Sequence, residues 1–269
     1  MEQIRRNEIR SDEIVLPNIR KIFAPDPGYV MIEGDLKGAD AQVVAWEAED
    51  EELKSAFRAG LDVHALNAET MLGSAFTRLT GHARDAKRQE TKKAVHATNY
   101  LGSPSSLSKS LGWTNHEADR FQKRWFSLHP NIKTKFHERI RSSLARSRTV
   151  YNVYGDRRYY FGRIDDCLAE AVAWVPQSTV AQTTYMGAFN LESRYWPEQQ
   201  RPGYFASDPA GLQLQVHDSI LFQFPITGCP PAQEIQKVLR VVTPYADPLY
   251  IPWDLKASTQ SWGDMTKFE

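Results

Sequence analysis

Two aspartates in this sequence lie where their carboxylates could face a ligand. Asp35 follows the apolar run YVMIEG, which predicts a buried strand, and precedes a segment of helical spacing, so it lies where a strand enters a helix. Asp218 separates two runs of alternating character, which predict two strands joined by a tight turn. Two carboxylates that converged could hold divalent ions ~3.5–4 Å apart, the arrangement that serves phosphoryl transfer to a hydroxyl. Magnesium prefers such oxygen ligands. Taken singly, each aspartate would be an ordinary turn or cap residue.

A second set of residues is spaced by four along a predicted helix: Arg88, Lys92, His96 and Tyr100. At about 3.6 residues per turn, each step of four drifts by only ~40°, so the four side chains form one slowly winding stripe. A cationic stripe with an aromatic end suits a triphosphate and its base. The alternative is a solvated helix face, which is the usual environment of spaced basic residues.

The elements that must position these residues alternate between strands and helices. A helical insertion is predicted between about residues 62 and 145, and an aromatic hairpin over 149–161 turns at Gly155-Asp156. A helix over about 168–195 follows, then the two strands around Asp218. A last helix over about 231–242 and a strand within PLYIPWDLKASTQSWGDM complete the chain.

Composition sets wide limits. The chain has 269 residues, 41% of them hydrophobic, with 33 basic and 33 acidic side chains that cancel. A small DNA-coating protein with a large positive charge is excluded, but a balanced enzyme that binds nucleic acid is not. Cys167 and Cys229 form no paired motif, so neither a disulfide framework nor a thiolate zinc site is expected. No stretch approaches the ~18 apolar residues of a membrane span, and a cytoplasmic setting, in a bacterial cell or a phage-infected host, is expected.

The motifs taken together resemble family A DNA polymerases, the polymerase I-like group. GDLKGADAQVVAWEAEDEEL is similar to the first catalytic motif, LQLQVHDSILF to the last, and RQETKKAVHATNYLGSPSSLSKSLG to the fingers helix that delivers the nucleotide. FRAGLDVHALNAE, VYNVYGDRRYYF and EAVAWVPQSTVAQ resemble further segments in the family's order. The resemblance runs from about residue 16 to residue 263.

The resemblance implies roles for individual residues. Asp35 and Asp218 would be catalytic and, with the backbone carbonyl of Leu36, would bind two Mg²⁺ ions, for which Mn²⁺ could substitute. The implied nucleotide-binding residues are Asp40, His64, Arg88, Lys92, His96 and Tyr100. The implied primer-template residues are Arg157, Gln177 and His217. The sequence departs from the family at Asp40, where a Glu is usual, at His96, where Phe or Tyr is usual, and at Leu101, where a Gly is usual.

The fold implied is of the α/β class, of α+β type. An antiparallel palm sheet would be backed by helices, with a large helical fingers insertion and without thumb and exonuclease domains. Residues 1–44 and 166–269 would form the palm, and residues 45–165 the fingers. The expected function is addition of dNTPs to the 3′-OH of a primer on a DNA template, without proofreading. A second polypeptide, or self-association, would supply the thumb and the start of the palm.

Two other functions remain open from the sequence. The first is a single-subunit RNA polymerase or primase relative, which would share the His-Asp-Ser motif around Asp218 and the spacing of Arg88 and Lys92. The second is a catalytically silent module that binds primer-template within a replication complex.

Overall fold

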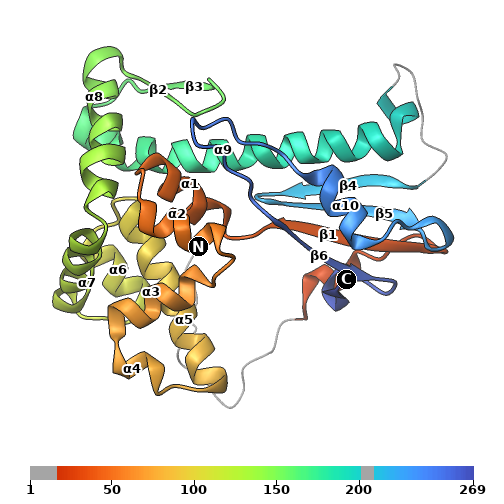
Figure 1. The fold of residues 1–269 in the computed structure, drawn as a ribbon, viewed down its shortest axis with the longest axis horizontal. Coiled ribbons are helices and arrows are strands. Elements are labelled where there is room, and N and C mark those ends of the chain that lie inside the picture. Colours follow the sequence, from red (N-terminus) through yellow and green to blue (C-terminus); the bar gives the residue numbers. More distant parts are fainter. Residues whose placement is uncertain (1–16, 201–208) are drawn as a thin grey trace.

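The computed structural model describes residues 17–200 and 209–269 of the chain. Its centre is a five-stranded sheet made of β1 (Tyr29–Leu36), β4 (Gly211–Val216), β5 (Ser219–Pro225), β6 (Trp253–Ser258) and β7 (Thr266–Lys267). The strand order is β4-β5-β1-β6-β7, and every pairing is antiparallel. β1 therefore lies in the middle, between β5 and β6 (Figure 1). The predicted antiparallel sheet is confirmed.

Helices fill the segment that follows β1. They are α1 (Ala39–Glu47), α2 (Glu51–Arg58), α3 (Val63–Leu72), α4 (Ser74–Thr77), α5 (Gly81–Asn99), α6 (Pro104–Leu111), α7 (Asn115–Leu128) and α8 (Glu138–Ser147). The single run of helical spacing predicted after Asp35 contains two helices, because the chain turns at Glu49, whose φ is +49°. Asp50 then starts α2 by accepting a hydrogen bond from the backbone N–H of Leu53. The predicted helical insertion is confirmed.

The remaining elements return the chain to the sheet. A π-helical turn, η2 (Ile132–His137), joins α7 to α8, and the predicted aromatic hairpin is formed by β2 (Thr149–Tyr151) and β3 (Arg157–Tyr159). The helix expected from residue 168 starts earlier, as α9 (Ile164–Tyr195). The last helix is α10 (Ala232–Leu239). Short 3-10 turns lie at η1 (Ile19–Ile22), η3 (Pro197–Gln200), η4 (Ile226–Gly228) and η5 (Trp262–Asp264).

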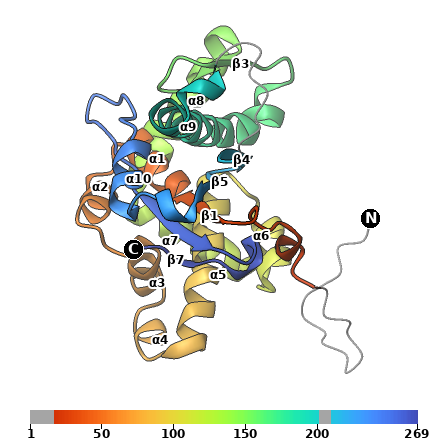
Figure 2. The same ribbon diagram turned by 90° about the vertical axis from the view of Figure 1, so that its right-hand side faces the viewer.

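The long helix α9 lies across the sheet. In the view of Figure 1 it runs above the strands, and the view turned by 90° shows it end-on, on the side away from α4 and α5 (Figure 2). Gly187 permits this close approach, since a Cβ there would lie 2.7 Å from Cζ2 of Trp253 on β6. The Trp253 indole is held in turn by a 2.9 Å hydrogen bond to the carbonyl oxygen of Leu239.

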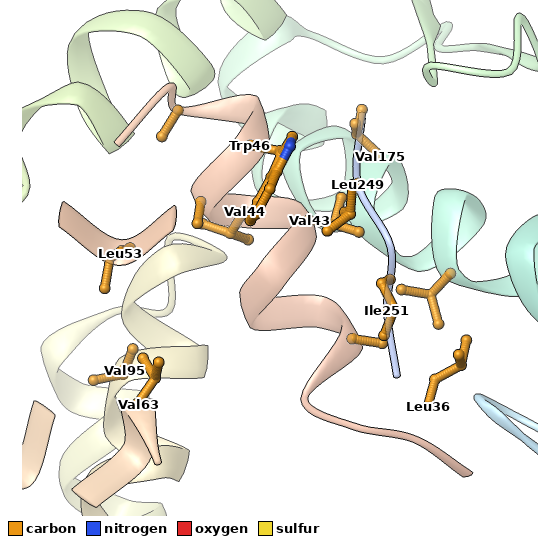
Figure 3. Close-up of a cluster of buried hydrophobic side chains, with 14 of the residues drawn as sticks. Leu36, Val43, Val44, Trp46, Leu53, Val63, Val95, Val175, Leu249 and Ile251 are labelled. Atoms are coloured by element: carbon orange, nitrogen blue, oxygen red, sulfur yellow. The ribbon is translucent and has the colours of Figure 1, made fainter. Parts of the chain in front are cut away.

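A continuous hydrophobic core ties the sheet to the helical insertion. Helix α1 lies at its centre: Val43 is drawn near Val175 of α9 and near Leu249, whereas Val63 of α3 and Val95 of α5 lie beside each other below it (Figure 3). Leu36, at the end of β1, is fully buried. The strand end that carries Asp35 is therefore anchored in the core, and its position relative to α3 and α5 is set by packing.

None of the helices in the described part of the chain is both long enough and apolar enough to span a bilayer.

Candidate active site

Asp35 and Asp218 converge at one end of the sheet. Asp35 pairs with Ser219 across β1 and β5, and the backbone N–H of Leu36 donates a 3.0 Å hydrogen bond to the carbonyl oxygen of Asp218. Asp218 lies on the predicted tight turn between β4 and β5, where His217 takes a left-handed conformation with φ +55°. Ser219 closes this turn by donating from Oγ to the carbonyl oxygen of Val216 at 2.9 Å.

The two carboxylates create a site that favours cations. Burial, together with the negative charges of Asp218, Glu33 and Asp254, raises the pKa of Asp35 to about 6, against an opposing effect of Lys256. Neither Asp35 nor Asp218 forms an ion pair with any side chain that the structure describes. A positive charge placed between the two carboxylates would relieve this repulsion.

A cavity of about 650 Å³ opens in front of the two aspartates. It lies between the end of β1, the first turn of α1, α3, α5 and the β4–β5 turn. Among its lining residues are eight that the resemblance singled out: Asp35, Leu36, Asp40, His64, Lys92, His96, Tyr100 and Asp218. The tertiary structure thus brings the candidate metal ligands and most of the candidate nucleotide-binding residues to one hollow.

Three members of the α5 stripe face this cavity: Lys92, His96 and Tyr100. The rings of His96 and Tyr100 meet edge to face with their centroids 4.4 Å apart. His96 Nδ1 lies 4.0 Å from Oδ2 of Asp40. Burial raises the pKa of Asp40, an effect that His96 opposes, and burial together with the Asp40 carboxylate raises the pKa of the Tyr100 phenol. The stripe and the first turn of α1 therefore form one polar wall.

Arg88, the fourth member of the stripe, does not line the cavity. Its Nε donates to Oδ2 of Asp62 at 2.7 Å, and its Nη2 donates to Oδ1 at 2.9 Å. Asp62 also caps α3 by accepting from the backbone N–H of Ala65. The sequence singled out Arg88 but not this partner, since no local spacing links the two residues.

His64 enters the cavity from the first turn of α3. Its Nδ1 is buried and has no hydrogen-bond partner among the residues that the structure describes, and the Tyr100 hydroxyl shares this property. Burial, together with the positive charges of Lys92 and Arg88, lowers the pKa of His64 to about 4. At neutral pH His64 is therefore an uncharged ring that can donate or accept one hydrogen bond to a bound ligand.

The three candidate primer-template residues lie outside this cavity. His217 is exposed beside Asp218 on the turn, Gln177 is exposed on α9, and Arg157 is exposed on β3 with its guanidinium 5.4 Å from the Tyr159 ring centroid. Their binding roles remain predictions. Gln89, Lys93 and Ser110 also line the cavity, although the sequence analysis did not select them. Lys93 could have been found from its position beside Lys92 on α5.

The donor set fits a hard divalent cation. The described residues contain no group of three or more His, Cys, Asp or Glu side chains placed to hold a metal. Two carboxylates are too few for a structural zinc or calcium cage, but Mg²⁺ is commonly held by one or two carboxylates, with waters and substrate phosphates completing its shell.

Comparisons with known proteins agree with this geometry. The bacterial DNA polymerase I of Thermus filiformis, a thermostable enzyme, is 28% identical over 88% of this chain, and that of Borreliella burgdorferi is 25% identical over 92%. The chain spans 27% and 26% of these two relatives, about a quarter of their length. The POL domain of Pol1 from M. smegmatis, solved in complex with DNA primer-template and dNTP, shares the fold with a TM-score of 0.73 at 19% identity, over 91% of this chain and 42% of that one. The model of DNA polymerase family A matches residues 4–264, and the chain belongs to that family.

Proposed function

We propose that this chain is the catalytic portion of a template-directed DNA polymerase, which adds dNTPs to a primer 3′-OH by two-metal-ion nucleotidyl transfer and does not proofread. The observation that carries the proposal is the convergence of Asp35 and Asp218 on one cavity with Lys92, His96 and Tyr100. Membership of DNA polymerase family A supports it. We propose the cytoplasm of a bacterial or phage-infected cell as its setting.

In this proposal Asp35, Asp218 and the carbonyl of Leu36 would hold two Mg²⁺ ions, with Mn²⁺ as a substitute. When bound, the ions would activate the 3′-hydroxyl and stabilise the departing pyrophosphate. Lys92 would bind the triphosphate from the α5 side, and His64 would contribute one neutral hydrogen bond to it. Arg88 would reach the phosphates after leaving Asp62. These residues would orient the triphosphate toward the two carboxylates.

Selection of the sugar and base would depend on the wall formed by Asp40, His96 and Tyr100. Asp40 is near His96, and both are reached from the cavity, so the ribose of a bound nucleotide would pack between α1 and α5. Tyr100 would lie under the templated base pair. Outside the cavity, Arg157, Gln177 and His217 would contact the primer-template. Residues 1–44 and 166–269 would act as the palm and residues 45–165 as the fingers.

We further propose that a second polypeptide completes the grip on the duplex. Tyr185, Met186 and Phe189 are exposed on α9, which contacts the edge strand β4, where Leu214 is also exposed. An apolar surface beside a sheet edge is typical of a protein interface. Light scattering of the purified chain, with and without DNA, measures its mass and tests for a partner. A monomer that extends primers processively by itself would contradict the proposal of a second polypeptide. A dimer would indicate self-association in place of a second polypeptide.

The function is tested by extension of a labelled DNA primer on a DNA template with Mg²⁺, in parallel with dNTPs and with rNTPs. Asp218→Ala should abolish extension, and Asp85→Ala, which changes an exposed aspartate of α5, should leave it unchanged. Preference for rNTPs would instead favour the RNA polymerase or primase reading. A cell extract that could supply a partner chain is added in a further reaction. If the chain binds the duplex but extends no primer even then, a silent binding module is favoured.

A further inference from the structure

A second cavity, of about 410 Å³, lies within the helical insertion, between the end of α3, the first half of α5 and α7. Met71, Phe121 and Trp113 form its apolar floor, and Met71 and Phe121 are almost completely buried. Lys87, Arg120 and Arg124 line it as well. An apolar hollow with a few convergent charged groups is the usual form of a small-ligand site.

The acidic neighbours of this cavity neutralise its positive charges only in part. Arg120 and Arg124 form no ion pair with any side chain in the described ranges 17–200 and 209–269. Glu117, which also lines the cavity, accepts hydrogen bonds from the backbone and hydroxyl of Thr114 in the capping box of α7. Lys87 does form a 2.7 Å ion pair with Glu90. Arg120, whose charge also acts on the Glu117 carboxylate, and the guanidinium donors of Arg124 that do not bind Thr70 are therefore available to an anion.

The aromatic part of the floor is held rigidly. Nε1 of Trp113 donates a 2.6 Å hydrogen bond to Oε1 of Glu90, the carboxylate that also binds Lys87. The centroids of the Trp113 and Phe121 rings are 5.3 Å apart, with their planes tilted by 52°. Arg124 is fixed at the rim, since its Nη2 donates to the carbonyl oxygen of Thr70 near the end of α3 at 2.8 Å.

This cavity is separate from the one at the two aspartates, although α5 is part of both walls. Lys87 and Lys92 are five positions apart, which places them ~140° apart around the helix axis. The two cavities have no lining residue in common. A ligand in the second cavity would contact the face of α5 that is turned away from Asp35 and Asp218.

We propose that the second cavity binds a nucleotide, with its base against Trp113 and its phosphate between Arg120 and Arg124. Aromatic side chains bind bases of any sequence through stacking, and arginine binds phosphate through paired N–H groups. The ligand is either a free nucleotide or an unpaired nucleotide of a single strand, because both present a base and a phosphate. The proposal goes beyond the catalytic site and does not depend on primer extension.

The test uses tryptophan fluorescence of the whole chain without divalent metal, titrated with dTMP and, separately, with the 5′-phosphorylated tetranucleotide of thymidine. Both ligands are expected to quench the emission, and most of this change should be missing in Trp113→Phe. Arg120→Glu should weaken binding at least about tenfold, since it replaces a phosphate partner by a like charge. Lys123→Glu makes the same charge change on α7 outside the cavity and should alter affinity less than about twofold.

Arg120 forms no hydrogen bond to another described side chain, so its replacement should leave the melting temperature unchanged, which is to be verified for each variant. Equal affinity for the two ligands would identify a free nucleotide as the occupant, and tighter binding of the tetranucleotide would identify a single strand. The proposal is overturned if Arg120→Glu and Lys123→Glu weaken binding equally, or if the quenching persists in Trp113→Phe. Asp218→Ala should bind both ligands normally, which separates this site from the catalytic one.

Discussion

Arg88 is bound to Asp62 by two parallel hydrogen bonds of 2.7 and 2.9 Å, which hold the guanidinium outside the cavity that Lys92 and His96 line. The same carboxylate caps α3, the helix that carries His64. The pKa of the Asp62 carboxyl is lowered by Arg88 and by the cap, against the opposing effect of burial. A triphosphate would have to compete with Asp62 for this guanidinium.

Asp62→Asn should therefore favour the nucleotide-bound state. Asparagine keeps the cap on α3 but loses the charge that holds Arg88, and a half-exposed pair of this kind contributes up to ~1 kcal/mol. The apparent Kd for an incoming nucleotide is expected to fall by about fivefold, as measured by titration on a dideoxy-terminated primer-template. Arg88→Ala is the control, since it should weaken binding. An unchanged or higher Kd in Asp62→Asn would show that the pair does not compete with the nucleotide.

The pKa of Asp35 predicts a stability cost at neutral pH. The folded pKa of about 6 exceeds the ordinary value of 3.8, so between these values the folded protein binds more protons than the unfolded one. The stability contributed by this group thus falls as pH rises from 3.8 and is lowest above about 6. Asp35→Asn should raise the melting temperature at pH 7.5 by about 3 °C, the effect of ~1 kcal/mol in a chain of this size, and leave it unchanged near pH 3.5. Asp85→Asn, at an exposed site, should change neither value.

Metal affinity should depend on the protonation state of the Asp35 carboxylate. Because a proton on Asp35 must leave before a cation can bind there, Mg²⁺ or Mn²⁺ affinity is expected to fall by about tenfold per pH unit below 6. Calorimetric titration with Mn²⁺ at pH 7.5, 6.0 and 5.0 measures this. In Asp35→Asn the metal should no longer raise the melting temperature. A metal affinity independent of pH between 5 and 7.5 would exclude Asp35 as a ligand.

Leu101 takes a left-handed backbone conformation, with φ +60°, directly after the cavity residue Tyr100. This conformation costs ~1–2 kcal/mol for residues other than glycine. Leu101→Gly should therefore be about 1 kcal/mol more stable than Leu101→Ala, although both lose the packing of the leucine side chain. Urea unfolding of the two variants measures the difference. At Ala86, inside α5, the order should be the reverse, with glycine about 1 kcal/mol less stable than alanine.

Asp50 and His129 form a buried pair that joins α2 to the end of α7, with Oδ2 and Nδ1 2.8 Å apart. The pKa of Asp50 is lowered because His129 and the Leu53 backbone stabilise the carboxylate against the opposing effect of burial. The contribution of the Asp50 carboxylate to stability is therefore fully present above the ordinary pKa of 3.8. It is lost as the pH falls through the lower pKa that Asp50 has in the folded protein. Asp50→Asn, which can retain the cap, should cost about 2 kcal/mol of unfolding free energy at pH 7.

The same Asp50→Asn variant and the wild type should converge in stability as the pH falls through the lowered folded pKa of Asp50, because both side chains are neutral below it. Thermal melts from pH 2.5 to 7 measure the two curves. A cost that stays constant over this range would mean that packing, and not the carboxylate charge, is responsible.

Much of the candidate site could be predicted from the sequence, because its signals are local. An apolar run ending at Asp35 and alternating runs on both sides of Asp218 predict a strand end and a tight turn, and the structure has both. Spacing by four along α5 predicts one face for Lys92, His96 and Tyr100, and these three do line one cavity. Helical and strand periodicity depend only on neighbours along the chain, so a single sequence contains them.

Only the tertiary structure decided what depends on distant contacts. The pairing of β1 with β5 places Asp218 against the backbone of Leu36. The ion pair with Asp62 separates Arg88 from the other three residues of the α5 stripe. The raised pKa of Asp35 and the second cavity between α3, α5 and α7 also result from packing. Burial and charge proximity depend on which surfaces meet in the core, and no spacing along the chain determines that.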